Sequence, residues 1–491
     1  MRKGFLIVMA VLLVAALAAP AMAGMDASGF IRIKSYMSNF YTGSATNPTL
    51  KADAPTQAYV EQRLRTKFSF GEENVKAVWF LETDFSAYGD AAGGTPVATA
   101  SVPTGTTTYY TGGAARNSGA ALGGDRINLE TKNIYLWFKL PNTSLDFTVG
   151  LQGQTDAYAG LLYGGADMAG IFMTGKYEPV SYKLGWAKLY ENNTAKTDDV
   201  TLYTAEVNFA PTKDSKMGVY FGLLQDDSQK IVNAAALPFP VVAGDENKKL
   251  IYTAGINGAF NAGPVALTGF AFYQWGTIDF LTPPFDSNVK VGGYALDLRG
   301  DMKIGPGKGF LEGLYISGDS DDNDDNYKGI VTLSDVNASP GGNSAYGRTG
   351  MSILLFNSDA INTSQSLVGS SSTAVSSNGF TGNTSPSNGG RGITHIAAGY
   401  TMPLGKQLTG AANVGWMAAT KKINVTDDTK KGKTMGTEVN ANVNYNIMKG
   451  LDFGLYGAYC WLGDYYQSNA AGAQADPDNV YDLHFRLNYA F

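Results

Sequence analysis

Charged side chains recur at alternate positions in three segments near the beginning of the sequence. In the segment 30–37, Arg32 and Lys34 alternate with apolar residues, and the segments 61–68 and 74–85 show the same pattern. Alternate residues of a β-strand point to opposite faces of a sheet, so each segment would place its charges on one face. The cations that would share that face are Arg32, Lys34, Arg63, Arg65, Lys67 and Lys76.

These six cations predict a basic wall along one side of a water-filled passage. Such a wall biases which ions enter, because it raises the local concentration of the opposite charge. The same face also carries Glu61, Glu82 and Asp84, so the alternative is a solvated face whose charges neutralise one another. In either case the charges must avoid lipid, since a lysine or arginine at the bilayer midplane costs about 2–4 kcal/mol.

Two segments near the end of the sequence alternate in the same way. In 480–491 every second residue is apolar or aromatic, up to Phe491. In 436–447 the polar positions are mostly asparagines, and a dry core would leave their amides unsatisfied at ~1–3 kcal/mol each. A barrel with lipid outside and water inside removes that cost. The wettable positions expected to line the interior are Glu438, Asn440, Asn442, Asp482, His484 and Arg486.

Short, turn-like links alternate with long polar connections along the whole chain. The short links, rich in Pro, Gly, Asn and Asp, lie at 71–74, 141–144, 178–181, 211–215, 261–264, 302–308, 403–407 and 448–450. The long connections lie at 40–56, 86–126, 153–167, 191–198, 226–248, 277–288, 319–392, 421–433 and 463–479. Together they predict eighteen strands in an all-β, antiparallel up-and-down transmembrane barrel with short periplasmic turns and long external loops. Sixteen strands is the alternative, and the count also depends on the apolar run 351–356, which we assign to a loop.

The first residues have the features of a secretory signal peptide. Arg2 and Lys3 precede an apolar stretch, and Ala21 and Ala23 form a small-x-small cleavage site. We expect cleavage after Ala23, which leaves a single barrel domain at 24–491 in the bacterial outer membrane. A transmembrane helix is the alternative, but no charged stop-transfer flank follows the apolar stretch.

The composition excludes several classes of chemistry. Cys460 is the single cysteine, so neither an intrachain disulfide nor a cysteine-based haem or zinc site can form. His395 and His484 are the two histidines, which makes a histidine-rich metal site a poor interpretation. Acidic residues outnumber basic ones, 43 to 37, which argues against nucleic-acid binding. We therefore expect no cofactor, and the expected partners are outer-membrane lipid and small solutes or ions.

Several stretches, taken in order, carry a resemblance to a known family. They are EQRLRTKFSF at 61–70, ENVKAVWFLETDF at 73–85, the hairpin-like stretch 123–152, GADMAGIFMTGKY at 165–177, and the final strands. In these stretches the chain resembles the homotrimeric outer-membrane porins of sulfate- and metal-reducing deltaproteobacteria. The resemblance implies a passive pore and a homotrimer of single-chain barrels. The long loops at 86–126 and 319–392 show no such resemblance, so no solute preference follows from it.

The third long connection, 153–167, is a candidate constriction loop. In many porins a loop in this position folds into the barrel. Asp156 and Asp167 are its carboxylates, and facing the basic wall they would set up a transverse field across the pore. The alternative is an ordinary external loop.

An acidic run at 318–326 is a weak candidate for calcium binding. Carboxylate and amide oxygens at this density can hold Ca²⁺, although the run lacks the glycine and glutamate spacing of an EF-hand. A solvated acidic loop is the plainer interpretation. The carboxylates in question are Asp319, Asp321, Asp322, Asp324 and Asp325.

A passive diffusion pore for small hydrophilic solutes is the function that these patterns favour. The main alternative is a solute-specific channel, or the barrel sheath of an electron-transfer or export complex whose haem would sit on a separate protein. A barrel phospholipase would need a Ser–His pair on the lipid-facing surface, but His484 falls on the other face, so we predict no enzyme. A non-conducting adhesion barrel is a further alternative. A plugged transporter is disfavoured, because strand-like alternation begins by Phe30.

Overall fold

The structure is a computed structural model of the 491-residue chain. It describes residues 24–40, 49–50, 53, 56–85, 88, 96–102, 105–110, 129–191, 198–227, 247–280, 288–321, 324–333, 346–355, 380–381, 387–422, 430–467 and 476–491. The predicted signal peptide at 1–23 lies outside the described residues.

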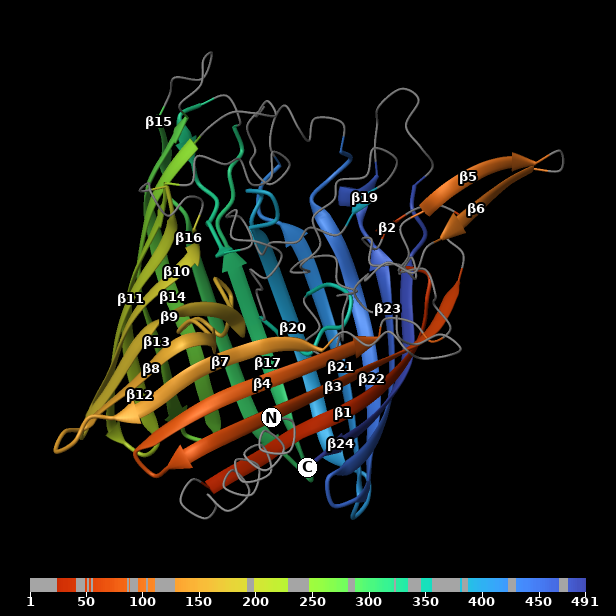
Figure 1. The fold of residues 1–491 in the computed structure, drawn as a ribbon. Helices are drawn as coiled ribbons and strands as arrows, with labels where there is room; N and C mark the ends of the chain where they lie inside the picture. The colour runs from red at the N-terminus through yellow and green to blue at the C-terminus, as the bar shows by residue number, and fades with distance from the viewer. Residues whose placement is uncertain are drawn as a thin grey trace, which may run out of the picture.

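Eighteen antiparallel strands form a closed barrel in the described part of the chain (Figure 1). Each strand pairs with the next along the sequence, and the first strand pairs with the last, from Phe30 opposite Ala490 to Ser38 opposite Asp482. The predicted count of eighteen is confirmed, and the alternative of sixteen is wrong. The barrel strands are β1 (Gly24–Ser38), β3 (Gln57–Glu72), β4 (Val75–Phe85), β7 (Glu130–Lys139), β8 (Leu145–Gln154), β9 (Ala166–Tyr177), β10 (Val180–Tyr190), β11 (Val200–Thr212), β12 (Ser215–Asp226), β13 (Asn247–Ala262), β14 (Val265–Phe280), β16 (Tyr294–Ile304), β17 (Gly307–Ile316), β20 (Ile393–Pro403), β21 (Leu408–Ala419), β22 (Thr434–Met448), β23 (Leu451–Leu462) and β24 (Val480–Ala490).

Shorter elements lie in the long connections. The hairpin β5–β6 extends away from the barrel (Figure 1). Among the described residues no helix is long and apolar enough to cross a membrane. The additional elements are β2 (Thr49–Leu50), β5 (Pro96–Val102), β6 (Gly105–Tyr110), β15 (Asn288–Val291), β18 (Asn326–Tyr327), β19 (Phe380–Thr381) and the 3-10 helix η3 (Asp464–Tyr466).

All eight predicted short links join neighbouring strands at one end of the barrel. Several of these turns need a positive φ at a glycine, among them Gly263 (φ 62°), Gly305 (φ 55°) and Gly450 (φ 80°), a conformation that residues with a Cβ rarely adopt. The strand ends from which the nine long connections run lie at the other end of the barrel. The apolar run at 351–355 belongs to one of these connections, as predicted.

Side chains alternate between an apolar outer face and a mixed inner face. In β24, Leu483, Phe485 and Tyr489 are exposed on the outside. The same pattern settles the register of β7, which the sequence leaves open because both of its faces are apolar. Ile134 and Leu136 of β7 are exposed on the outside, where β8 places Leu151 and Val149 opposite them.

The interior of the barrel is partly filled. On the inner faces of β1, β22 and β24, side chains are exposed or half-buried toward the turn end and become buried toward the loop end. An apolar cluster that includes Tyr158, Leu161, Ile353 and Leu354 packs among the buried inner-face residues. Three described segments of the long connections, Thr155–Gly165, Ile330–Leu333 and Tyr346–Leu355, therefore fold into the barrel.

Candidate functional site in the barrel interior

The predicted basic wall lies on adjacent strands at the turn end of the interior. Arg32 of β1 is directly opposite Arg63 of β3, and Arg65 is directly opposite Glu82 of β4. The Arg63 and Arg65 side chains keep 11% and 23% of their surface exposed. Arg32, Lys67 and Lys76 are likewise half-buried.

One carboxylate partly neutralises this wall. Glu82 Oε2 lies 3.6 Å from Arg63 Nε and also accepts a hydrogen bond from Arg65. Asp84 is opposite Arg63 in the strand register, but its side chain lies outside the described part of the structure. Glu130 of β7 is directly opposite Glu82, so the five cations share this part of the interior with at least these two described carboxylates.

Lys34 behaves differently from the other five cations. It is fully buried, directly opposite Glu61 of β3, which is buried as well. Its Nζ lies 4.4 Å from the centre of the Tyr36 ring. The prediction that Lys34 and Glu61 line open water is therefore wrong. Both side chains point inward, but neighbouring side chains cover them.

His484 and Asp482 also point inward and are buried. His484 Nδ1 lies 2.7 Å from Asp482 Oδ2, and the His484 ring stacks on Tyr456 with 4.6 Å between ring centres. Tyr36 lies on the other side of the histidine ring, 5.4 Å away. The expectation that His484 and Asp482 line water is corrected by this packing. Arg486, one step closer to the turn end, remains partly exposed.

The polar face of β22 shows the same change along a single strand. Asn442 and Asn444 are half-buried and Asn446 is exposed, whereas Asn440 is nearly covered and Glu438 is fully buried. The predicted water-lined face is therefore wet toward the turn end alone. Toward the loop end, inward-folded segments cover it.

The predicted constriction loop is one of these segments. Its Asp156 carboxylate is buried and accepts four backbone hydrogen bonds from its own loop: Oδ1 from Tyr158 and Gly160, Oδ2 from Leu162 and Tyr163, at 2.6–2.9 Å. Burial raises the pKa of Asp156 to about 6, and the four N–H donors oppose that shift. By accepting these four hydrogen bonds, the Asp156 carboxylate fixes the conformation of the loop.

Aromatic packing holds this loop inside the barrel. The Tyr158 ring is fully buried and contacts Tyr220, Phe270 and Phe272, with ring centres 5.2, 5.4 and 4.6 Å away. Those three side chains lie on the inner faces of β12 and β14. The inward position agrees with a constriction loop, and the narrowing of a pore stays a prediction.

The two loop carboxylates do not face the basic wall. The acceptor atoms of Asp156 are taken by its own loop. Asp167 lies at the start of β9, where its Oδ2 is 2.6 Å from Lys132 Nζ and its Oδ1 accepts a hydrogen bond from Asn133. The predicted transverse field from these two residues is therefore not supported, because local donors already satisfy both.

A second group of carboxylates on the inner wall escaped the sequence reasoning. Asp297 of β16 and Glu312 of β17 are buried side by side, and the Tyr346 hydroxyl lies 2.5 Å from an oxygen of each. Arg348 pairs with Asp297 at 3.0 Å, and Arg299 pairs with Glu312 at 3.3 Å. The alternation in β16 and β17 was the available signal, because it places both carboxylates on the inner face.

Two acidic clusters lie among the long connections. In the predicted calcium run, Asp319 accepts backbone hydrogen bonds from Ser320, Asp321 and Lys328, and burial raises its pKa. Asp324 and Asp325 bond within the same turn, and Asp322 is outside the described residues. These local bonds favour a structural role for the run.

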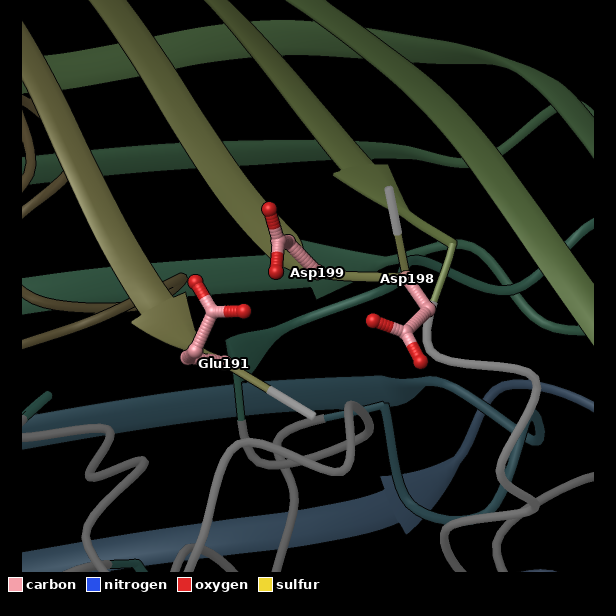
Figure 2. Close-up of side chains that lie close together, drawn as sticks. All are labelled: Glu191, Asp198 and Asp199. Atoms are coloured by element: carbon pink, nitrogen blue, oxygen red, sulfur yellow. The ribbon is translucent and has the colours of Figure 1, made fainter. Parts of the chain in front are cut away.

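The other acidic cluster joins the end of β10 to the start of β11. Figure 2 shows its members, Glu191, Asp198 and Asp199, whose carboxylate oxygens lie within 4.8 Å of one another. Lys188 Nζ lies 2.5 Å from Glu191 and 2.7 Å from Asp199. This ammonium offsets part of the negative charge of the cluster.

The two other residues considered for chemistry, His395 and Cys460, are both buried. His395 of β20 is buried on the inner face, beside the position of Gly415. Cys460 is buried on the inner face of β23, directly opposite Glu438.

A closed eighteen-stranded antiparallel barrel with an apolar exterior and a charged interior is the fold of outer-membrane porins. No protein-family model and no curated protein matches the sequence. Solved structures do match the fold. OccAB4 of Acinetobacter baumannii has a TM-score of 0.50 at 10% identity, over 95% of this chain and 98% of that one. OccK8 (OprE) of Pseudomonas aeruginosa has a TM-score of 0.49 at 10% identity, over 95% and 98%. At this identity the likeness concerns the fold alone.

Proposed function

We propose that this protein is an outer-membrane porin through which small hydrophilic solutes and ions diffuse. The observation that supports the proposal most directly is the division of each barrel strand into a lipid-compatible outer face and a charged inner face. An apolar exterior is stable in hydrocarbon, and a charged interior that remains partly exposed needs water. A barrel that is closed by β1 and β24 leaves no unpaired strand edge in the membrane.

The basic wall gives the proposed channel a preference for anions. Arg32, Arg63 and Arg65 lie on adjacent strands, so their fields add where a solute crosses the turn end of the interior. Glu82 reduces the effect without cancelling it. The preference is electrostatic, and we expect it to weaken at high salt, because ions screen partly exposed charges.

Reversal potentials across a salt gradient test this proposal. Arg63→Glu combined with Arg65→Glu changes the charge of the wall by four, and we expect the channel to shift toward cations. The matched control is Lys406→Glu with Lys449→Glu, which makes the same change in exposed turns. An unchanged reversal potential in the wall variant would exclude the basic wall. A wild-type protein that does not conduct in planar bilayers would exclude the channel itself.

A solute-specific channel is the second candidate function. The filled loop end of the interior favours it, since buried aromatic and charged side chains leave less room than an open pore would. Uptake by liposomes containing the protein separates the two candidates. A diffusion porin admits solutes in order of size, whereas a specific channel admits one solute class ahead of smaller ones.

We also propose that the mature chain starts at Gly24 and assembles as a homotrimer related to the porins of sulfate- and metal-reducing bacteria. The support is the signal-like N-terminal sequence and the resemblance of the N-terminal hairpins. N-terminal sequencing of the membrane-extracted protein and the mass of its detergent complex test these two points.

A further inference from the structure

The segment Tyr346–Leu355 is held inside the barrel by an inner-wall carboxylate. Glu438 Oε1 accepts a hydrogen bond from the backbone N–H of Ser352 at 2.7 Å. Its Oε2 accepts from Ile353 and Leu354 at 2.9 and 2.8 Å. Glu438 has no exposed surface. Three consecutive N–H groups therefore converge on one buried charge, and hydrogen bonds to a charged group are the strong kind.

Further anchors precede this one along the segment. The Gly350 carbonyl accepts hydrogen bonds from Asn440 at 2.9 Å and from Asn413 at 3.4 Å. At the start of the segment, the Tyr346 hydroxyl reaches Asp297 and Glu312. Burial and these two neighbouring carboxylates raise the pKa of Tyr346 well above its usual value, so its hydroxyl keeps its proton.

These anchors pair the segment with side chains of the wall, and the segment's own Arg348 adds an ion pair with Asp297 at 3.0 Å and a hydrogen bond to Thr268 at 2.5 Å. In the described part of the chain, no backbone–backbone hydrogen bond joins this segment to a strand. Apolar burial of Met351, Ile353 and Leu354 supplies the rest of the hold. The barrel strands are instead fixed to one another by continuous ladders. A change in one wall side chain can therefore release the segment while the barrel stays closed.

We propose that Tyr346–Leu355 is a gate of the channel and that Glu438 is its positioning residue, the latch that keeps the gate in place. This inference rests on the proposed function, because a gate requires a conducting protein. Leaving the interior, the segment would uncover Glu438, Asp297 and Glu312. The open state is then wider and less anion-selective than the closed state.

Single-channel recording of Glu438→Gln tests the latch. Glutamine has nearly the same shape, but its amide nitrogen is a donor and cannot accept the N–H groups that now bond to the second oxygen. We expect roughly tenfold more time in a high-conductance state than in wild type. Asp452→Asn is the matched control. It removes one inner-face carboxylate that pairs with Arg486 and has no contact with the gate, and we expect it to leave the open time unchanged.

A reversible disulfide lock between the gate segment and the barrel wall distinguishes release of the gate from a general change in the pore. A Cβ at Gly415 would lie 2.5 Å from Met351 Sδ, 3.2 Å from its Cγ and 3.0 Å from His395 Cε1, so positions 415 and 351 are in contact and form a cysteine pair whose oxidation can be tested. We would introduce Met351→Cys and Gly415→Cys into the Glu438→Gln protein, with Cys460→Ala to remove the native thiol. Oxidation should return the open time toward wild type, and reduction should raise it again.

Either of two results would overturn the gate. One is a Glu438→Gln channel with the open time and selectivity of wild type. The other is an oxidised lock, verified by thiol titration, that leaves the high-conductance state unchanged. A wild-type protein without any conductance would instead overturn the proposed function.

Discussion

Two of the segments that fold into the barrel, Thr155–Gly165 and Tyr346–Leu355, are held in opposite ways. The fold of Thr155–Gly165 depends on contacts within the segment, because Asp156 accepts four hydrogen bonds from N–H groups of its own loop. Tyr158 of the folded loop then packs against side chains of the wall. Tyr346–Leu355 depends on the wall, because Glu438, Asn440 and other strand residues supply its polar anchors. The difference predicts that the first segment stays in place in the barrel and that the second can leave it, as the proposed gate requires.

The comparison also separates two uses of a buried carboxylate. The carboxylates of Asp156 and Glu438 are both stabilised by hydrogen bonds from backbone N–H groups. In the first case the donors lie within seven residues along the chain, so folding the loop brings them together. In the second case the donors are 84 to 86 residues away, so the bond forms only if the whole barrel places the two parts together. Asp156 therefore fixes the conformation of its own loop, whereas Glu438 attaches a segment that is far away in the sequence to the wall.

Of the changes that test this difference between the two segments, replacing Asp156 with alanine should have the largest effect. Four buried N–H groups lose their acceptor, at about 1–3 kcal/mol each, so we expect the 155–165 loop to lose its fold. Hydrogen exchange of the protein in micelles measures this directly. Protection should disappear at Tyr158–Tyr163 and persist at Ser352–Leu354. Loss of protection in both segments would show that they depend on each other, contrary to the comparison.

Tyr158→Ala should have the next largest effect. It removes the ring that fills the space between Tyr220, Phe270 and Phe272, at a cost of about 3 kcal/mol. The turn itself should survive, because Asp156 keeps its bonds, but the loop should detach from the wall. Conductance should therefore rise with little loss of amide protection within the loop. Tyr177→Ala, at an 81% exposed position, is the control, and equal effects of both changes would contradict the packing argument.

A change of pH should produce the smallest effect and confine it to one segment. The pKa of Asp156 rises from 3.8 in a solvated chain to about 6 in the folded loop, so the folded loop binds a proton more tightly. This contribution to stability is fully present below pH 3.8 and is lost as the pH rises through 6. Lowering the pH from 7 to 5 should thus strengthen protection at Tyr158–Tyr163 by about 1 kcal/mol, after correction for intrinsic exchange rates. Asp156→Asn should lose this dependence.

Much of the fold was predictable because the information it needs is local. Alternation in segments such as 436–447 and 480–491 reports strands that separate lipid from the interior, and turn residues report where each hairpin closes. The strand count, the eight turns and the loop position of the 351–355 run follow from that information. The register of β7 did not, because both of its faces are apolar and the correct one depends on its neighbours.

The sequence predicted toward which face the side chains of the candidate site point, but it did not predict which residues surround them. Parity correctly sends Lys34, Glu438 and His484 inward, and it says nothing about what covers them. The sequence also could not show that Asp167 is satisfied by Lys132, or that Asp297 and Glu312 meet Tyr346. Each of these contacts joins different strands or loops, so its existence depends on the assembled barrel.

By itself, the sequence determined which side of each strand faces lipid, since a period of two is a property of the strand alone. Only the tertiary structure decided which part of the interior is wet. Whether a charge meets water depends on loops that return from distant parts of the chain, and the arginines at the turn end stay partly exposed because these loops fill the other end.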